Sequence, residues 1–172
     1  IDIVVTKNRW QLMLANMTTL YGAFGTGSQP GGGSTVTENP MFVPAEVFYN
    51  GKQWYKVGVR FKGNSSLEST WKGGNYKMSL KLDFDEFEDQ YSQIDNQRFN
   101  GFKQLSLKNN FDDKSMLREK VAADIFRSEG LAVSNTAFYV VYVDYGDGPT
   151  YFGVYTLTEE VDDTVIKNQF AD

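Results

Sequence analysis

Polar and apolar residues alternate along much of the chain, and this period of two predicts β-strands. The clearest case is the segment 76–85, where one face would carry Tyr76, Met78, Leu80, Leu82 and Phe84. Similar patterns predict strands at 3–6, 47–49, 54–61, 103–108, 136–145 and 149–158. Asn50-Gly51 follows the strand at 47–49 and predicts a tight hairpin, because both residues readily adopt positive φ angles.

Apolar residues at helical spacing predict an amphipathic stretch around 10–17 and a principal helix over 114–129. Asp112 or Asp113 would cap the start of the principal helix, and Gly130 would end it. Polar residues predict loops at 63–74 and 83–100. This order of elements predicts an α+β fold, a mostly antiparallel sheet with one principal helix, in a single domain that spans residues 1–172.

Arg118 lies at the centre of the apolar face of the predicted principal helix. That face consists of Leu117, Val121, Ala122, Ile125 and Phe126. An unpaired guanidinium in a core costs several kcal/mol, so we expect a carboxylate, a phosphate or backbone carbonyls beside it. A structural salt bridge and a functional contact both satisfy this requirement. Glu119 lies at the margin of the same face.

The chain has 172 residues, with 17 Lys and Arg against 22 Asp and Glu, and a net charge of −5 at pH 7. A mildly acidic protein lacks the general positive field that attracts nucleic acid, so we expect no nucleic-acid partner. The sequence contains no histidine and no cysteine, which excludes imidazole bases, thiol nucleophiles, disulfides and zinc sites built from them. No run approaches the ~20 apolar residues of a membrane-spanning helix, so no membrane span is expected.

Two loops resemble ligand-binding segments only superficially. Segment 22–34 is rich in glycine, but it lacks the Lys-Ser/Thr ending of a nucleotide phosphate loop, so we expect a flexible loop. The acidic segment 83–89 contains carboxylates of the kind that bind calcium. Phe87 stands at a ligand position there and no glycine follows, so a solvated loop is expected.

A basic cluster is the stronger candidate for chemistry. It consists of Arg60, Lys62, Lys77 and Lys81, with the small residues Gly63, Asn64, Ser65 and Ser66 in the turn between the two predicted strands. Backbone amides and hydroxyls of such a turn can approach an anion, and the cations would complete a phosphate site. The solvated face of an antiparallel sheet has the same pattern, so both interpretations stay open.

Four blocks of the sequence, at 57–67, 77–82, 107–118 and 153–159, together resemble the spore coat protein H (CotH) family. The most specific block contains Arg60 followed by Gly63, Asn64, Ser65 and Ser66. The resemblance implies an atypical protein kinase, similar in fold to the secretory-pathway kinases, of which this chain would be the N-terminal lobe. Such a kinase transfers the γ-phosphoryl group of ATP, with Mg or Mn, to Ser of secreted or coat proteins.

The resemblance also implies roles for individual residues. Gly63, Asn64, Ser65 and Ser66 would form the phosphate turn beside Arg60. Lys77 or Lys81 would be the strand lysine that contacts phosphate, and their shared face leaves the choice open. Glu119 would be the helix acid that holds this lysine, with Arg118 organising the site. The chain would pass the adenine at residues 157–159, ending at Glu159.

By the same resemblance, the catalytic base and the metal-binding acids would belong to a C-terminal lobe expected after residue 172. We therefore expect no catalytic and no metal-binding residue within this chain, no tight nucleotide binding and no phosphoryl transfer by it alone. The resemblance further implies a bacterial protein exported to the extracellular space, the cell surface or the spore surface. The alternative is a non-catalytic structural or binding module of a surface or spore-coat assembly.

Overall fold

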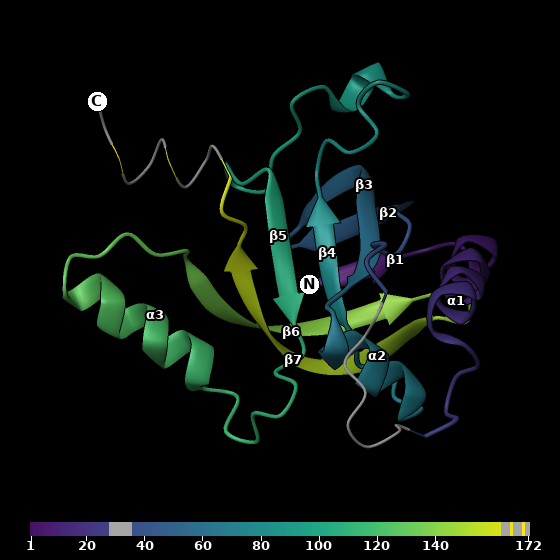
Figure 1. Ribbon diagram of the computed structural model, residues 1–172. Helices are drawn as coiled ribbons and strands as arrows, with labels where there is room; N and C mark the ends of the chain where they lie inside the picture. Colours follow the sequence, from purple (N-terminus) through teal and green to yellow (C-terminus); the bar gives the residue numbers. More distant parts are fainter. Residues whose placement is uncertain (28–35, 163–165, 167–169, 171–172) are drawn as a thin grey trace.

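The seven segments predicted as strands are all strands in the computed structural model, which describes residues 1–27, 36–162, 166 and 170. They are β1 (Asp2–Val4), β2 (Val43–Tyr49), β3 (Lys52–Lys62), β4 (Ser79–Asp83), β5 (Gln104–Lys108), β6 (Thr136–Asp144) and β7 (Pro149–Glu159). Their order is β1-β2-β3-β4-β5-β7-β6, and β6 pairs with β1, so the sheet closes into a barrel (Figure 1).

The predicted α+β fold, a mostly antiparallel sheet with one principal helix that resembles the N-terminal lobe of a kinase, is wrong. Within the described residues the structure is a closed, mixed barrel with three α-helices. β1 runs antiparallel to β2 and parallel to β6, so that Ile3 lies opposite both Val47 and Val143. Alternation along a strand predicts which side chains are buried, but it does not predict which strands share an edge. For this reason the closure could not be inferred from the pattern.

The three α-helices are α1 (Lys7–Tyr21), α2 (Ser65–Lys72) and α3 (Arg118–Ser128), and a short 3-10 helix, η1, spans Ser92–Ile94. The Thr6 hydroxyl caps α1 by accepting a hydrogen bond from the amide of Arg9 at 3.4 Å. α2 lies within the segment predicted as the loop 63–74, and that prediction is also wrong. Leu67 and Trp71 form its buried face one turn apart, among polar residues that concealed the helical spacing.

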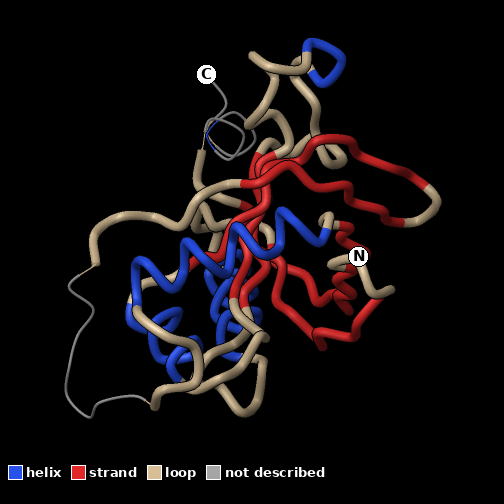
Figure 2. The backbone as a smooth tube through the Cα atoms, turned by 90° about the vertical axis from the view of Figure 1, so that its right-hand side faces the viewer, coloured by secondary structure: helices blue, strands red, loops and turns tan. Residues whose placement is uncertain are grey.

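Aromatic side chains close the two ends of the barrel. At one end α1 contributes Trp10, whose ring centroid lies 5.6 Å from that of Phe61 and 5.0 Å from that of Tyr145. At the other end the ring centroid of Phe99 lies 4.6 Å from that of Trp54. Buried aliphatic side chains from alternate strand positions fill the space between, among them Ile3, Val47, Val59, Leu82, Leu105, Leu107 and Val143. The β4–β5 connection, which carries η1, projects beyond the strands in both ribbon views (Figures 1 and 2).

α3 begins four residues later than the predicted start at 114, and its apolar face is exposed. Val121, Ile125 and Phe126 retain 47%, 55% and 49% of their surface, and Ala123 is the buried residue of the helix. Arg118 is exposed as well, and its guanidinium donates to the carbonyl oxygen of Asp112 at 3.2 Å. The expected burial of Arg118 is therefore wrong, because no described segment covers this face, although a backbone carbonyl does lie beside its guanidinium.

Residues 28–34 of the predicted glycine-rich loop lie outside the described part of the chain. Residues 22–27 come directly after α1 in the sequence, and the amides of Gly25 and Gly27 donate to carbonyls of α2. Among the helices that the structure describes, none combines the length and the apolar character needed to cross a membrane.

Candidate functional site

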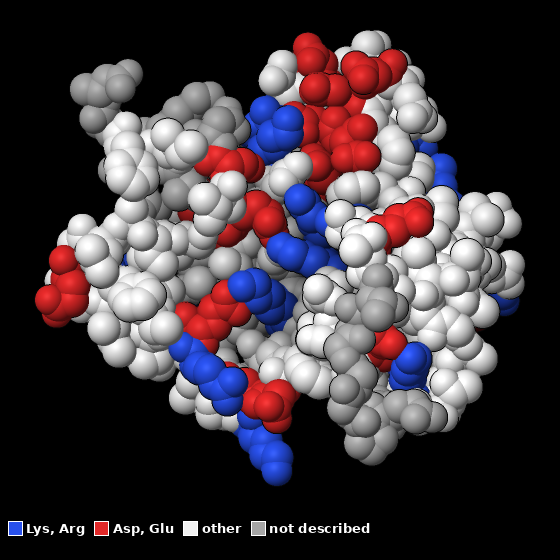
Figure 3. All heavy atoms as spheres, viewed as in Figure 1, with Lys and Arg blue, Asp and Glu red and all other residues white. Residues whose placement is uncertain are grey.

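Two adjoining cavities lie between α3 and the outer surface of the barrel, with volumes of about 400 Å³ and 320 Å³. Lys62 at the end of β3, Lys108 at the end of β5, and Glu119 and Ala122 of α3 line both cavities. Because they share these four residues, the cavities form one groove, which we call the α3 groove. Lys and Arg side chains gather in the middle of this face of the molecule (Figure 3).

Strand register places cations from different strands side by side on the outer surface. Arg60 on β3 lies opposite Lys81 on β4, and Lys81 lies opposite Ser106 on β5. Lys62 lies opposite Ser79 in the neighbouring row. Alternation along each strand therefore presents these charges on one face, while the intervening residues fill the barrel.

Two ion pairs hold the lysines of the α3 groove. The Lys62 ammonium contacts the carboxylate of Glu160, which also accepts a hydrogen bond from the Ser106 hydroxyl. Burial alone would raise the pKa of Glu160, but the bonds from Lys62 and Ser106 and the charge of Lys81 hold it below its usual range. Lys108 pairs with Glu119, so β5 supplies the lysine that contacts the acid of α3.

One wall of the larger cavity consists of Gly63, in the turn between β3 and α2, and Ser66, in the first turn of α2. Gly63 has a φ of 130°, and a Cβ atom there would lie 2.8 Å from Ser66 Oγ and 3.1 Å from Leu67 Cβ. Both the backbone conformation and the lack of space thus require glycine. Asn64 and Ser65 are exposed next to the cavity, at the start of α2.

The structure separates the two lysines that the sequence left equivalent. Lys81 lies in the strand row between Arg60 and Ser106. Lys77 precedes β4, lines neither cavity, and places its ammonium 5.4 Å from the centroid of the Tyr155 ring, close to Gly153. Burial lowers the pKa of Lys77. The pKa of Arg60 is also lowered by burial, against the opposing effect of Glu160.

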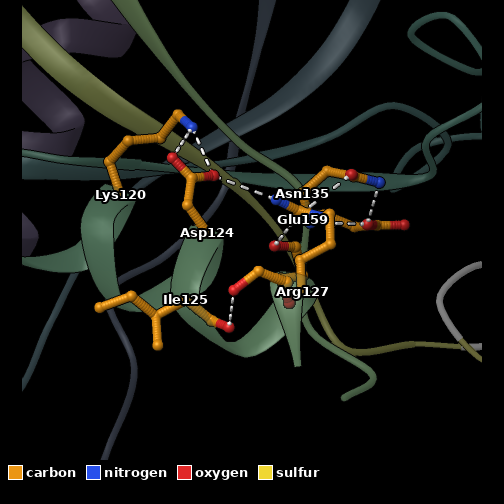
Figure 4. Close-up of polar contacts among 8 residues, drawn as sticks. Lys120, Asp124, Ile125, Arg127, Asn135 and Glu159 are labelled. Atoms are coloured by element: carbon orange, nitrogen blue, oxygen red, sulfur yellow. Dashed lines mark hydrogen bonds and ion pairs between the residues drawn. The ribbon is translucent and has the colours of Figure 1, made fainter. Parts of the chain in front are cut away.

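The remaining predicted site residues lie along the α3 groove. Arg118 lines the larger cavity and Glu159 the smaller one. Glu159 is buried, and its Oε2 atom accepts hydrogen bonds from the backbone and side-chain nitrogens of Asn135 at 3.1 Å and 3.0 Å. Arg127 of α3 donates to Ser134 O at 3.2 Å, next to Asn135, so these contacts tie the end of α3 to the barrel (Figure 4).

Several buried polar atoms that face the α3 groove have no hydrogen-bond partner. Within the described residues they are Asn110 Nδ2 in the larger cavity and Thr136 Oγ1, Thr158 Oγ1 and Glu159 Oε1 in the smaller one. Such atoms are costly to leave unsatisfied, and their clustering makes this part of the groove polar. Asp83 Oδ1 is a further atom of this kind, outside the groove.

A family model described as CotH kinase protein matches residues 59–172, about two thirds of the chain. The chain belongs to the CotH kinase family. The match begins within β3 and includes every residue of the α3 groove named above. A search of curated proteins finds no match.

A CotH kinase requires a divalent metal for phosphoryl transfer. Among residues 1–27, 36–162, 166 and 170, no group of three or more acidic side chains is arranged to hold a metal ion. The acids of the α3 groove, Glu119 and Glu160, are instead paired with lysines. Within the described part of the chain, the acids of the α3 groove are therefore not arranged as a metal site.

Sequence reasoning missed Lys108 and Glu160 of the α3 groove. Lys108 carried a usable signal, because it ends a predicted strand and falls directly within the third CotH-like block. Glu160 carried none, since its contact with Lys62 joins residues 98 positions apart and depends on how β7 meets β5 in the barrel.

Proposed function

We propose that the α3 groove binds the phosphate groups of ATP, and that this chain is the nucleotide-binding part of a kinase that phosphorylates Ser in secreted or coat proteins. The observation that carries the proposal is that Lys62 and Lys108 line both cavities, so any ligand in the groove meets two cations. Membership of the CotH kinase family supports the choice of a nucleotide over other anions.

The groove also has room and polar groups for the rest of a nucleotide. Cavities of a few hundred Å³ are typical of small-molecule sites. The lysines would contact phosphate where the two cavities meet, between Gly63 and Ser66 of the larger cavity and Glu160 of the smaller one. In the smaller cavity, the hydroxyls of Thr136 and Thr158 and the carboxylate of Glu159 would bind the ribose or the adenine amino group, which would satisfy their unpaired atoms.

Phosphoryl transfer requires metal ions that neutralise the developing charge and a residue that positions the acceptor hydroxyl. The described residues offer no metal-binding group. We therefore expect the 172-residue chain to bind ATP weakly and to transfer no phosphate by itself.

Calorimetric titration of the chain with ATP and with adenosine tests the proposal. ATP should bind and adenosine should bind at least tenfold more weakly, because the phosphates provide the contacts with the lysines. Lys108→Ala should weaken ATP binding at least tenfold. Lys7→Ala is the matched control, because it removes an exposed lysine that pairs with Asp147 far from the groove. Equal binding of ATP and adenosine, or an unchanged affinity in Lys108→Ala, would contradict the proposal.

A further inference from the structure

Glu160 lies at the point where the cations of the outer surface converge. It follows the last residue of β7, and its carboxylate receives the Lys62 ammonium and the Ser106 hydroxyl. Lys81 acts on the same carboxylate through its charge, and Glu160 is the acid that acts most strongly on Arg60. One carboxylate thus contacts one cation of β3 and one hydroxyl of β5, and the charges of Arg60 and Lys81 act on it from further away.

This set of partners is the one that a phosphate oxygen would use. Ammonium, guanidinium and hydroxyl groups are the usual donors to phosphate, and a carboxylate is the protein group that most resembles a phosphate in its acceptor geometry and charge. A ligand phosphate and the Glu160 carboxylate would therefore compete for the same donors. They would also repel each other if both occupied the site.

The position of Glu160 allows its side chain to move away from Lys62 and Ser106. Its side chain is 21% exposed, and the residue lies outside the strand ladder, with its amide donating to Gln104 O at 3.3 Å. Rotation of the side chain toward solvent would therefore break no strand pairing. The adjacent Glu159, by contrast, is buried and held by Asn135.

We propose that Glu160 occupies the phosphate position of the α3 groove when no ligand is bound, and that it must be displaced by the incoming phosphate. This proposal rests on the proposed function. Glu160 then acts as a built-in competitor that sets the affinity of the site for phosphate-containing ligands. A residue that merely oriented Lys62 for phosphate would have the opposite effect, because its loss would weaken binding.

The test compares the affinities of the wild-type chain and Glu160→Gln for inorganic pyrophosphate and for ATP, measured by calorimetric titration at constant ionic strength. Glutamine keeps the size of the side chain and removes the competing charge. We expect both ligands to bind Glu160→Gln at least tenfold more tightly, equivalent to about 1.4 kcal/mol. Affinity for adenosine should not change, since adenosine carries no phosphate.

Asp147→Asn is the control, because it removes the negative charge of an exposed loop residue. Among the described residues, Asp147 pairs only with Lys7. It should bind both ligands within about twofold of wild type, as remote exposed charges are screened by salt. Glu160→Ala removes the carboxylate without adding an amide and should change affinity in the same direction as Glu160→Gln. Circular dichroism and a thermal melt establish that each variant is folded.

The outcomes separate the two proposals. Tighter binding of pyrophosphate and ATP by both Glu160 variants supports the competitor role. Equal or weaker binding by them, with measurable binding by wild type, overturns the competitor role and leaves the proposed function intact. No binding of either ligand by any of the proteins overturns both.

Discussion

Gly63 shows how a single residue shapes the phosphate turn. Its φ of 130° is unfavourable for any L-residue with a side chain, and Leu67 Cβ leaves no space for one. We expect Gly63→Ala to lower the free energy of unfolding by about 2–3 kcal/mol, measured by urea denaturation. Gly101 also has a positive φ, of 97°, but open space around it.

Gly101→Ala is therefore the control that isolates the conformational penalty, which we expect to be about 1–2 kcal/mol. The loss in Gly63→Ala should exceed it because of the added contact with Leu67. Equal losses in the two variants would show that the turn relaxes and that the close contact has no energetic effect.

Asp83 gives the molecule a distinctive pH dependence. Its side chain is buried, and burial, a hydrogen bond with Asp85 and the charges of Asp85 and Glu86 raise its pKa from 3.8 to about 6. Between these two values the folded protein keeps a proton that the unfolded chain has lost, so the contribution of Asp83 to stability falls as the pH rises from about 4 to 6. Well above pH 6 Asp83 is ionised in both the folded and the unfolded protein, and its destabilising effect no longer changes with pH.

Asp83→Asn removes this titration while keeping the size of the side chain. The free energy of unfolding of the variant, relative to wild type, should therefore increase between pH 4 and pH 7. Urea denaturation across this range measures it. A constant difference between the two proteins would show that Asp83 is ionised over the whole interval. Glu160 has a lowered pKa and works in the opposite direction, but it is present in both proteins.

Among the elements, α3 differs from the strands in how little of its apolar surface is buried. Ile125 is 55% exposed, whereas Leu107 on β5 is fully buried. Leu107→Ala should cost about 2–5 kcal/mol in unfolding free energy, because it leaves a cavity in the barrel. Ile125→Ala should change stability by less than about 0.5 kcal/mol, as an exposed substitution. A loss above 2 kcal/mol in Ile125→Ala would show that its face is covered in solution.

The sequence predicted the strands better than the helices, for physical reasons. All seven strands were found because a half-buried strand alternates strictly, as Leu80 and Leu82 do on β4. α2 was missed because two turns of helix with only two buried apolar residues, Leu67 and Trp71, give no lasting period. The helical period of α3 was found, but the assumption that an apolar face is a buried face placed Arg118 wrongly.

At the scale of the whole molecule, the sequence placed a basic cluster, either a phosphate site or a solvated sheet face, on the polar faces of two strands, but not the residues that surround it. Arg60 and Lys81 are neighbours in the structure, as alternation and a β3–β4 pairing suggested. Lys108 and Glu160 enter the site only because β5 lies between β4 and β7 in the barrel. Such contacts depend on strand order, which local patterns do not encode.

The function proposed for this chain depends on the binding of ATP phosphates in the α3 groove. The most direct test is a titration of the ¹⁵N-labelled chain with ATP, followed by the shifts of assigned backbone amide resonances. We expect saturable shifts concentrated at Gly63, Ser66, Asn109, Asn110 and Glu160, and their loss in Lys108→Ala. Shifts that concentrate instead on the outer face of β6, around Val140 and Tyr142, or no shifts at millimolar ATP, would contradict the proposed function.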